Sequence, residues 1–214
     1  DFSRDGILRS VEESLTRTGL DRFDILYLHD PDDHFEQACT EGIQTLIELR
    51  EQGVVRAVGA GMNSAPYLTQ LIERADVDIV MCAGRFTLLD SSAVADLLPL
   101  AHERGVGVVA AGIYNSGLLA SPRPPANATY DYVQAPAELI GRAHRIADAC
   151  EAHGVTLPDA AIAYVLRHPA VVSVVVGVRT PAQLAQTIDR YETHIPEALW
   201  RDLAEHHLIP ESLA

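Results

Sequence analysis

Side chains that can do chemistry stand at the ends of short apolar runs in this 214-residue sequence. One run ends at His29, which Asp30 follows directly, and Asn63 stands just after the next run. A neutral imidazole N–H can stabilise an oxygen that gains negative charge during a reaction, and an amide can both donate and accept hydrogen bonds. His29 is therefore the candidate catalytic residue. The alternative is a histidine that caps its strand through Asp30 or the backbone.

The acidic turn after His29 contains residue types that bind metals. Asp30, Asp32, Asp33 and His34 follow one another closely, but neighbours on a turn point in different directions, and no partner cluster occurs elsewhere in the sequence. We therefore expect no metal site. A metal-dependent barrel hydrolase that uses His29, Asp30 and His34 remains an alternative function.

Two later runs end in residues suited to ligand binding. Arg85 follows one of them, where a charge needs either an anionic or hydroxyl-rich ligand or a buried salt bridge, and both interpretations stay open. The other run leads into Asn115, Ser116, Gly117 and Leu118. Glycine lets the backbone approach a ligand closely, and backbone N–H groups can face an anion, so this stretch suits a pyrophosphate. The alternative is a simple turn.

A regular alternation of strands and helices is expected to position these residues. The expected strands are apolar on both faces, as strands covered on both sides must be, and span residues 23–29, 54–59, 78–82, 106–111 and 171–177. Segments of helical period span residues 6–18, 41–50, 65–74, 93–104, 137–153 and 158–167. Strand and helix in alternation predict right-handed βαβ units and a parallel sheet in one domain over residues 1–214.

Two architectures have parallel βα repeats. A doubly wound sheet usually carries Gly-x-Gly-x-x-Gly after its first strand, and the nearest candidate, residues 58–63, lacks the third glycine. A barrel instead places its chemistry at the carboxyl ends of its strands, where the polar residues stand here. The sequence therefore favours an α/β fold of the (β/α)8 TIM-barrel type. The Pro-rich segment 121–136 is long enough to be functional or mobile.

Composition restricts the partners. The formal net charge is −14, which disfavours nucleic acid and anionic membranes because both would be repelled. The apolar fraction of 48% is that of an ordinary globular chain, and no apolar run is long enough to span a bilayer. The three cysteines form no C-x-x-C spacing, so neither a disulfide framework nor a zinc ribbon is indicated. We expect a cytoplasmic protein without nucleic-acid or membrane partners.

Several stretches together resemble the aldo-keto reductase family, and within it the aldose dehydrogenase branch (L-fucose or D-threo-aldose dehydrogenase and pyridoxal 4-dehydrogenase). They are 14–15, 19–22, 24–32, 83–89 and 113–119, and the likeness covers essentially the whole chain. The resemblance implies hydride transfer between a nicotinamide cofactor, NAD or NADP, and a small aldose or aldehyde. It also implies that His29 lies beside the substrate carbonyl and polarises it. Arg85 is the candidate substrate-binding residue because of its position after a buried strand.

The same resemblance assigns the cofactor-binding residues. Met62 and Asn63 stand where the family holds the nicotinamide carboxamide, and Asn63 can alternatively cap a glycine turn. The remaining residues implied to bind the cofactor are Tyr114, Asn115, Ser116, Gly117, Leu118, Gly177, Arg179, Gln183 and Gln186. Gln183 stands where NADP-preferring members often have arginine, which favours NAD slightly. Trp200 is expected to pack the last helix rather than to bind a ligand.

Other parts of the family's machinery are missing from this sequence. The family's reaction uses a tyrosine acid, a lysine that lowers its pKa, and an aspartate that pairs with the lysine. None of the seven tyrosines lies in the expected Asp-Thr-Ala-x-x-Tyr-Gly type of segment, and all 16 residues counted as Lys and Arg are arginine. We therefore expect only strands four to eight of the barrel, with the missing N-terminal half in the same polypeptide. The alternative function is a non-catalytic remnant or subunit that binds NAD(P)H.

Overall fold

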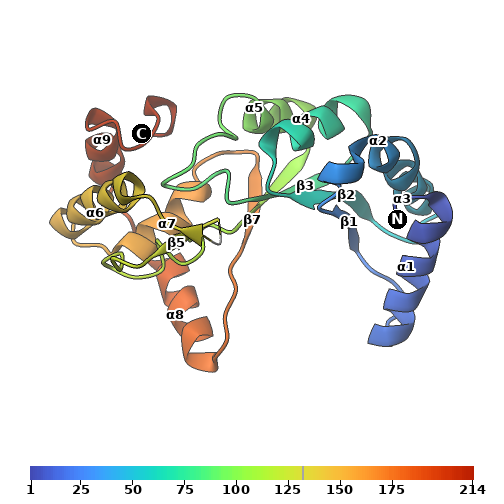
Figure 1. The fold of residues 1–214 in the computed structure, drawn as a ribbon, viewed down its shortest axis with the longest axis horizontal. Coiled ribbons are helices and arrows are strands. Elements are labelled where there is room, and N and C mark those ends of the chain that lie inside the picture. Colours follow the sequence, from blue (N-terminus) through green and yellow to red (C-terminus); the bar gives the residue numbers. More distant parts are fainter. Residues whose placement is uncertain (132) are drawn as a thin grey trace. The chain divides into compact units, whose positions relative to one another are not determined.

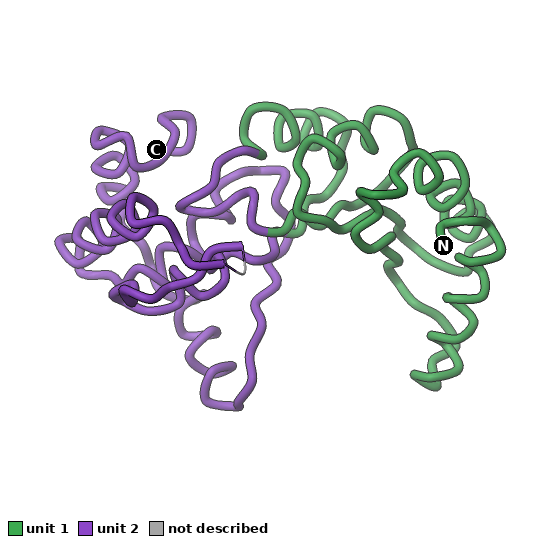
Figure 2. Tube along the Cα trace, in the orientation of Figure 1, with its two compact units in different colours: residues 1–83, 93–109 green, residues 84–92, 110–214 purple. Residues whose placement is uncertain are grey.

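The computed structural model describes residues 1–131 and 133–214 as two compact units. Unit 1 comprises residues 1–83 and 93–109, and unit 2 comprises residues 84–92 and 110–214, as Figure 2 shows in green and purple. The boundary falls inside strand β4 (Gly107–Ala111), so both units share one strand. The expectation of a single domain over residues 1–214 stays a prediction.

Helices and strands alternate along the chain, as expected from the sequence (Figure 1). Unit 1 contains α1 (Arg4–Thr18), β1 (Ile25–His29), η1 (Asp32–His34), α2 (Phe35–Gln37), η2 (Ala38–Gly42), α3 (Ile43–Glu51), β2 (Ala57–Met62), α4 (Ala65–Arg74), β3 (Ile79–Ala83) and α5 (Leu97–Arg104). After β4, unit 2 contains β5 (Thr129–Tyr130), β6 (Val133–Gln134), α6 (Ala137–Ala152), α7 (Leu157–Val165), β7 (Val171–Val175), α8 (Pro181–Glu192), α9 (Glu197–Glu205) and η3 (Glu211–Leu213).

The sheet confirms the expected α/β architecture. Its strand order is β1-β2-β3-β4-β7, and the pairings of β1 with β2 and of β2 with β3 are parallel. The ladder fixes where β2 begins, because the N–H groups of Arg56 and Ala57 both donate to the carbonyl of Asp24, at 3.1 and 3.0 Å. The strand expected over residues 54–59 therefore starts three residues later.

The core of unit 1 forms where the helical pattern predicted it. Ile43, Leu46, Ile47 and Leu49 of α3 are all buried, and Ile43 has no exposed area. On α1 the pattern was less informative. Ile7 is buried, but the other residues on the same predicted face, Val11, Ser14 and Leu15, are only half-buried. Burial of aliphatic side chains at this level is the main contribution to the stability of such a layer.

Strand β7 does not have the covered faces that its sequence suggested. Val172 is 61% exposed and Val175 is 47% exposed. The expectation that this run is buried on both faces is wrong, because Val172 and Val175 are three positions apart and so lie on opposite faces of the strand. Apolar composition predicted the strand but not the exposure of its two faces.

The Pro-rich segment 121–136 contains two short strands that the sequence did not suggest. Thr129 pairs with Gln134 and Tyr130 with Val133 in an antiparallel hairpin. Tyr132, one of the seven tyrosines considered above, lies outside the described residues. No helix among the described residues combines the length and the apolar character needed to cross a membrane.

Candidate active-site residues

In unit 1, the carboxyl ends of β1 and β2 lie side by side. His29 is the register partner of Gly61, and the N–H of Asp30 donates to the carbonyl of Gly61 at 2.9 Å. Asp30 then takes a positive φ of 43°, which turns the chain away from the strand. His29 and Asn63 therefore lie at the same, carboxyl end of the sheet, as the barrel interpretation predicted.

The imidazole of His29 is open to solvent in this structure. Its side chain is 89% exposed, and its Nε2 lies 3.5 Å from a carboxylate oxygen of Asp30. A contact of that length between two exposed groups is at the limit of a hydrogen bond and fixes the ring weakly. The cap through Asp30 is therefore weak, and the ring is accessible to a ligand at the carboxyl edge.

The two candidates after β2 differ in accessibility. Met62 is the last residue of β2 and is 2% exposed, so its side chain packs in the core. Asn63 is exposed, and its amide is at the surface beside the end of β1. The geometry thus favours Asn63 and argues against Met62 as a residue that touches a cofactor.

In unit 2, the loop after β4 uses its backbone N–H groups internally. The N–H of Asn115 donates to Gly112, that of Gly117 to Tyr114, and that of Leu118 to Asn115, at 2.9, 3.0 and 3.1 Å. Asn115, Ser116 and Gly117 all have positive φ, at 44°, 56° and 94°, which is how the chain closes these successive turns. The expected backbone cradle for a pyrophosphate is not preformed here, because these three N–H groups already have acceptors.

Two side chains of the same loop, those of Tyr114 and Asn115, each bury a polar atom. The hydroxyl of Tyr114 and the Oδ1 of Asn115 are buried without a hydrogen-bond partner among the described residues. Burial raises the pKa of Tyr114, and the nearby Arg190 guanidinium offsets that effect only in part. Tyr114 is therefore a buried phenol that keeps its proton near neutral pH. Leu118 is fully buried and serves as a core residue.

Arg85 is held by ion pairs rather than left available for substrate. Its guanidinium contacts Asp90 at 3.2 Å and Asp131 at 2.9 Å, and its side chain is 20% exposed. The hydroxyl of Tyr130 also donates to Asp90, at 3.1 Å. Of the two interpretations left open by the sequence, the structure favours the salt bridge, and the role of Arg85 as a substrate contact is not supported.

The charges around Arg85 also shift the pKa values of Asp90 and Tyr130. Burial would raise the pKa of Asp90, but hydrogen bonds from Ser92, and then from Tyr130 and Arg85, outweigh it and lower that pKa. Burial and the adjacent Asp90 raise the pKa of Tyr130 to about 12. Asp90 is therefore the ionised centre that ties residues 84–92 to the β5–β6 hairpin.

The connection from β7 to α8 is exposed and cationic. Gly177, Arg179, Gln183 and Gln186 are all exposed, and Thr180 caps the helix by accepting from the N–H of Gln183 at 3.2 Å. The Oε1 of Gln183 accepts from the backbone N–H of Arg179 at 2.7 Å. Gln183 thus fixes the backbone of Arg179, an exposed residue two positions before the start of α8.

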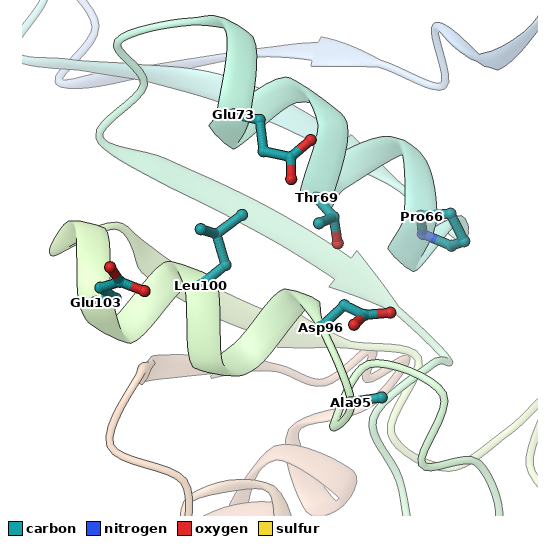
Figure 3. Close-up of a pocket in the computed structure, with 7 residues that line it drawn as sticks. All are labelled: Pro66, Thr69, Glu73, Ala95, Asp96, Leu100 and Glu103. Atoms are coloured by element: carbon teal, nitrogen blue, oxygen red, sulfur yellow. The ribbon is translucent and has the colours of Figure 1, made fainter.

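A surface groove elsewhere in unit 1 does not coincide with these residues. It lies between α4 and α5, as Figure 3 shows, and is lined by Pro66, Thr69, Glu73, Ala95, Asp96, Leu100 and Glu103. Its three carboxylates would repel an anionic dinucleotide. Across residues 1–131 and 133–214 no group of three or more His, Cys, Asp or Glu is arranged to hold a metal ion, so the metal-dependent hydrolase has no support.

The sequence interpretation missed the residues that complete the cluster around Arg85. Asp90, Tyr130 and Asp131 are needed to account for Arg85, yet Asp131 is 46 positions away in the chain. No local pattern identifies such a partner. The internal bonds of the loop after β4 were more accessible to prediction, because Asn-Ser-Gly is a typical composition for turns with positive φ.

Comparisons with known proteins agree with this architecture. The model of the aldo/keto reductase family matches residues 1–207. The chain is 46% identical over 211 residues to D-threo-aldose 1-dehydrogenase of a Pseudomonas species, and 40% identical over 219 residues to pyridoxal 4-dehydrogenase of Microbacterium luteolum. Each match covers 98% of this chain and 64% of the relative.

A solved structure shows the same fold. The holo form of the aldo-keto reductase AKR11C1 from Bacillus halodurans matches with a TM-score of 0.79 at 25% identity, over 100% of this chain and 68% of that chain. The matches extend along essentially the whole sequence. They give no support to the narrower expectation that only strands four to eight are present, and they cover about two thirds of the relatives' own length.

The family assignment rests on both kinds of comparison. The family model covers far more than half of the chain. The fold neighbour has the TIM-barrel type of α/β architecture that the strand order of the parallel sheet suggested. The chain belongs to the aldo/keto reductase family.

Proposed function

We propose that this chain belongs to an NAD(P)-dependent oxidoreductase that transfers a hydride between the nicotinamide and a small aldose or aldehyde. The proposal rests on the carboxyl ends of β1 and β2, which lie side by side. The accessible imidazole of His29 and the amide of Asn63 follow one another there on neighbouring strands. A histidine at the carboxyl end of a parallel strand is well placed to act on a bound carbonyl.

Each unit holds residues whose chemistry suits one part of a nicotinamide dinucleotide. In unit 1, Asn63 can donate to and accept from a carboxamide. In unit 2, Arg179 offers a guanidinium to a phosphate or to the ribose at the adenosine end, and Gln183 holds its backbone. The loop at Asn115–Leu118 fits less well, because its N–H groups have internal acceptors. When bound, the dinucleotide supplies or accepts the hydride.

His29 has a separate task in this proposal. A neutral imidazole donates a hydrogen bond to the substrate oxygen, on which negative charge develops as a carbonyl is reduced. In the oxidative direction the same bond orients the hydroxyl. Arg179 with a single guanidinium, and Gln183 in place of a second arginine, favour NAD over NADP. The names of the relatives, a D-threo-aldose and a pyridoxal dehydrogenase, suggest aldoses and aromatic aldehydes as the first substrates to try.

A second candidate function is binding of NAD(P)H without turnover. It is favoured by the absence of lysine from the sequence. A phenol of ordinary pKa, about 10, is a poor proton donor and acceptor near neutral pH without a nearby cation. In this case the chain would sense or store the dinucleotide rather than catalyse its reduction.

Replacement of His29 by alanine tests the catalytic role. With NAD and a panel of D-threo and other aldoses, we expect the His29→Ala variant to lose about 100-fold in kcat/KM, because one preorganised donor to a developing oxyanion contributes roughly that factor. The KM for NAD should change little. NADH formation at 340 nm is the measurement.

His34→Ala is the matched control, since His34 is another exposed histidine on the same connection. Its activity should stay within about twofold of the unaltered chain. Equal losses in both variants would contradict a specific role for His29. Dinucleotide binding with no turnover in any variant would favour the second candidate, and absence of both binding and turnover would eliminate the two proposals together.

A further inference from the structure

A cluster of two histidines and one aspartate lies at the C-terminal end of unit 2, remote in sequence from every residue assigned above. The Nε2 of His153, just after α6, lies 2.9 Å from the Oδ2 of Asp202 on α9. The Nδ1 of His206, just after α9, lies 2.9 Å from the Oδ1 of the same carboxylate. The Asp202 carboxylate thus contacts the imidazole rings of both His153 and His206.

The two contacts have different structural consequences. His153 and Asp202 belong to different helices, so their contact joins α6 to α9. His206 and Asp202 are four residues apart, and the Nδ1 of His206 also donates to the backbone carbonyl of Asp202 at 2.9 Å. The second contact therefore closes the last turn of α9 and orients the carboxylate that His153 meets.

Two arginines also bind the C-terminal segment, residues 197–214. Arg142 donates to the carbonyl of Leu208 at 2.8 Å, and Arg167 donates to the carbonyl of Leu213 at 3.0 Å and pairs with Glu197. Arginine stays protonated at all ordinary pH values. The carboxylate of Glu205 also acts on His206 and raises its pKa, and Arg201 and His207 stand next to Asp202 and His206 in the sequence.

Protonation of the His206 imidazole strengthens its contact with Asp202. A neutral imidazole can donate one N–H to Asp202, but an imidazolium adds a charge–charge attraction to the same bond. His206 also stands at the C-terminal end of a helix, where the helix dipole favours a positive charge. The hydrogen bond to the Asp202 backbone and the Asp202 carboxylate raise the pKa of His206.

We propose that His206 and Asp202 form a pH-sensitive clasp that holds the last turn of α9, and with it the carboxylate that His153 of α6 contacts, in weakly acidic solution and loosens as the pH rises. A group whose pKa is higher in the docked state stabilises that state below its undocked pKa, near 6.5 for histidine. That stabilisation disappears as the pH rises through the docked pKa.

Hydrogen exchange measured by mass spectrometry at pH 5.5 and pH 8.0 tests the clasp in the intact chain. After correction for the intrinsic exchange rates, we expect amide protection in α9 to fall between about two- and fivefold from pH 5.5 to pH 8.0, the range for surface ion pairs. Helix α4 of unit 1, which carries no histidine, serves as the internal reference. In Asp202→Asn the fall should disappear.

Two further variants keep the test decisive if Asp202→Asn is generally less stable. His206→Gln should reduce the pH-dependence while it leaves His153 and Asp202 in place. His194→Gln, which removes an exposed histidine just before α9, should leave the pH-dependence unchanged. An NMR titration of the His206 ring should give a lower pKa in Asp202→Asn than in the unaltered chain. A protection ratio that is the same in the unaltered chain, Asp202→Asn and His206→Gln would overturn the proposal.

Discussion

Replacement of Trp200 by alanine is expected to lower the free energy of unfolding by about 4 kcal/mol, in the range for truncation of a large buried aromatic residue. Trp200 is 1% exposed, its ring centroid lies 6.0 Å from that of Tyr164, and the guanidinium of Arg167 lies 5.0 Å above it. Removal of the indole leaves a cavity between α7 and α9 and takes away the cation–π contact of Arg167. This loss would be large compared with the total stability of an ordinary domain.

Urea unfolding followed by far-UV circular dichroism is the appropriate measurement. Trp200 is the only tryptophan in the sequence, so its fluorescence is lost in the variant. Tyr191→Ala is the control, because Tyr191 is an aromatic residue of the same unit that is 61% exposed, and it should change stability by less than about 0.5 kcal/mol. Similar losses for the two variants would show that Trp200 does not anchor α9.

Replacement of Gly59 by alanine is expected to destabilise unit 1 by about 3 kcal/mol, at the upper end of the usual range for overpacking. A Cβ at this position would stand 1.6 Å from the carbonyl oxygen of Ile79 and 2.8 Å from its carbonyl carbon. Both atoms belong to the backbone of β3, so a side-chain rotation cannot relieve the clash. Strands β2 and β3 would have to separate, which breaks their ladder.

Gly61→Ala provides a graded control on the same strand. A Cβ there would meet the Cβ of Met81 at 3.3 Å, a side-chain contact that a small shift can relieve. We expect a loss of less than about 1 kcal/mol in the urea unfolding of this variant. If both glycine variants unfold at the same urea concentration as the unaltered chain, the close approach of β2 to β3 is not a feature of the folded protein.

Local patterns in the sequence were sufficient to predict the main elements. The apolar residues of α3 recur at helical spacing and are all buried, and each expected strand forms within a few residues of its predicted position. Val172 and Val175 show where this reasoning fails. Their composition predicts a strand, but whether the faces of a strand are covered depends on packing against distant segments.

The site was predicted in part for the same reason. The placement of His29 and Asn63 at one edge follows from parallel pairing of consecutive strands, which the sequence indicated. The pairing of Arg85 with Asp131 could not be predicted, because it joins residues far apart in the chain through a hairpin that no local pattern revealed. Burial of Met62 beside exposed Asn63 depends on which face of β2 meets the core, a choice that an apolar run covered on both sides leaves ambiguous.

The central claim is that the 214-residue chain binds a nicotinamide dinucleotide, and a fluorescence titration with NADH tests it most directly. We expect saturable binding, weakened about tenfold by Arg179→Ala, because a charge-assisted hydrogen bond to a phosphate contributes roughly that much affinity. Arg145→Ala, which removes an exposed arginine on α6, should bind as the unaltered chain does. Absence of saturable binding by the folded chain at millimolar NADH, or equal affinities for NADH in the Arg179→Ala and unaltered chains, would contradict the account.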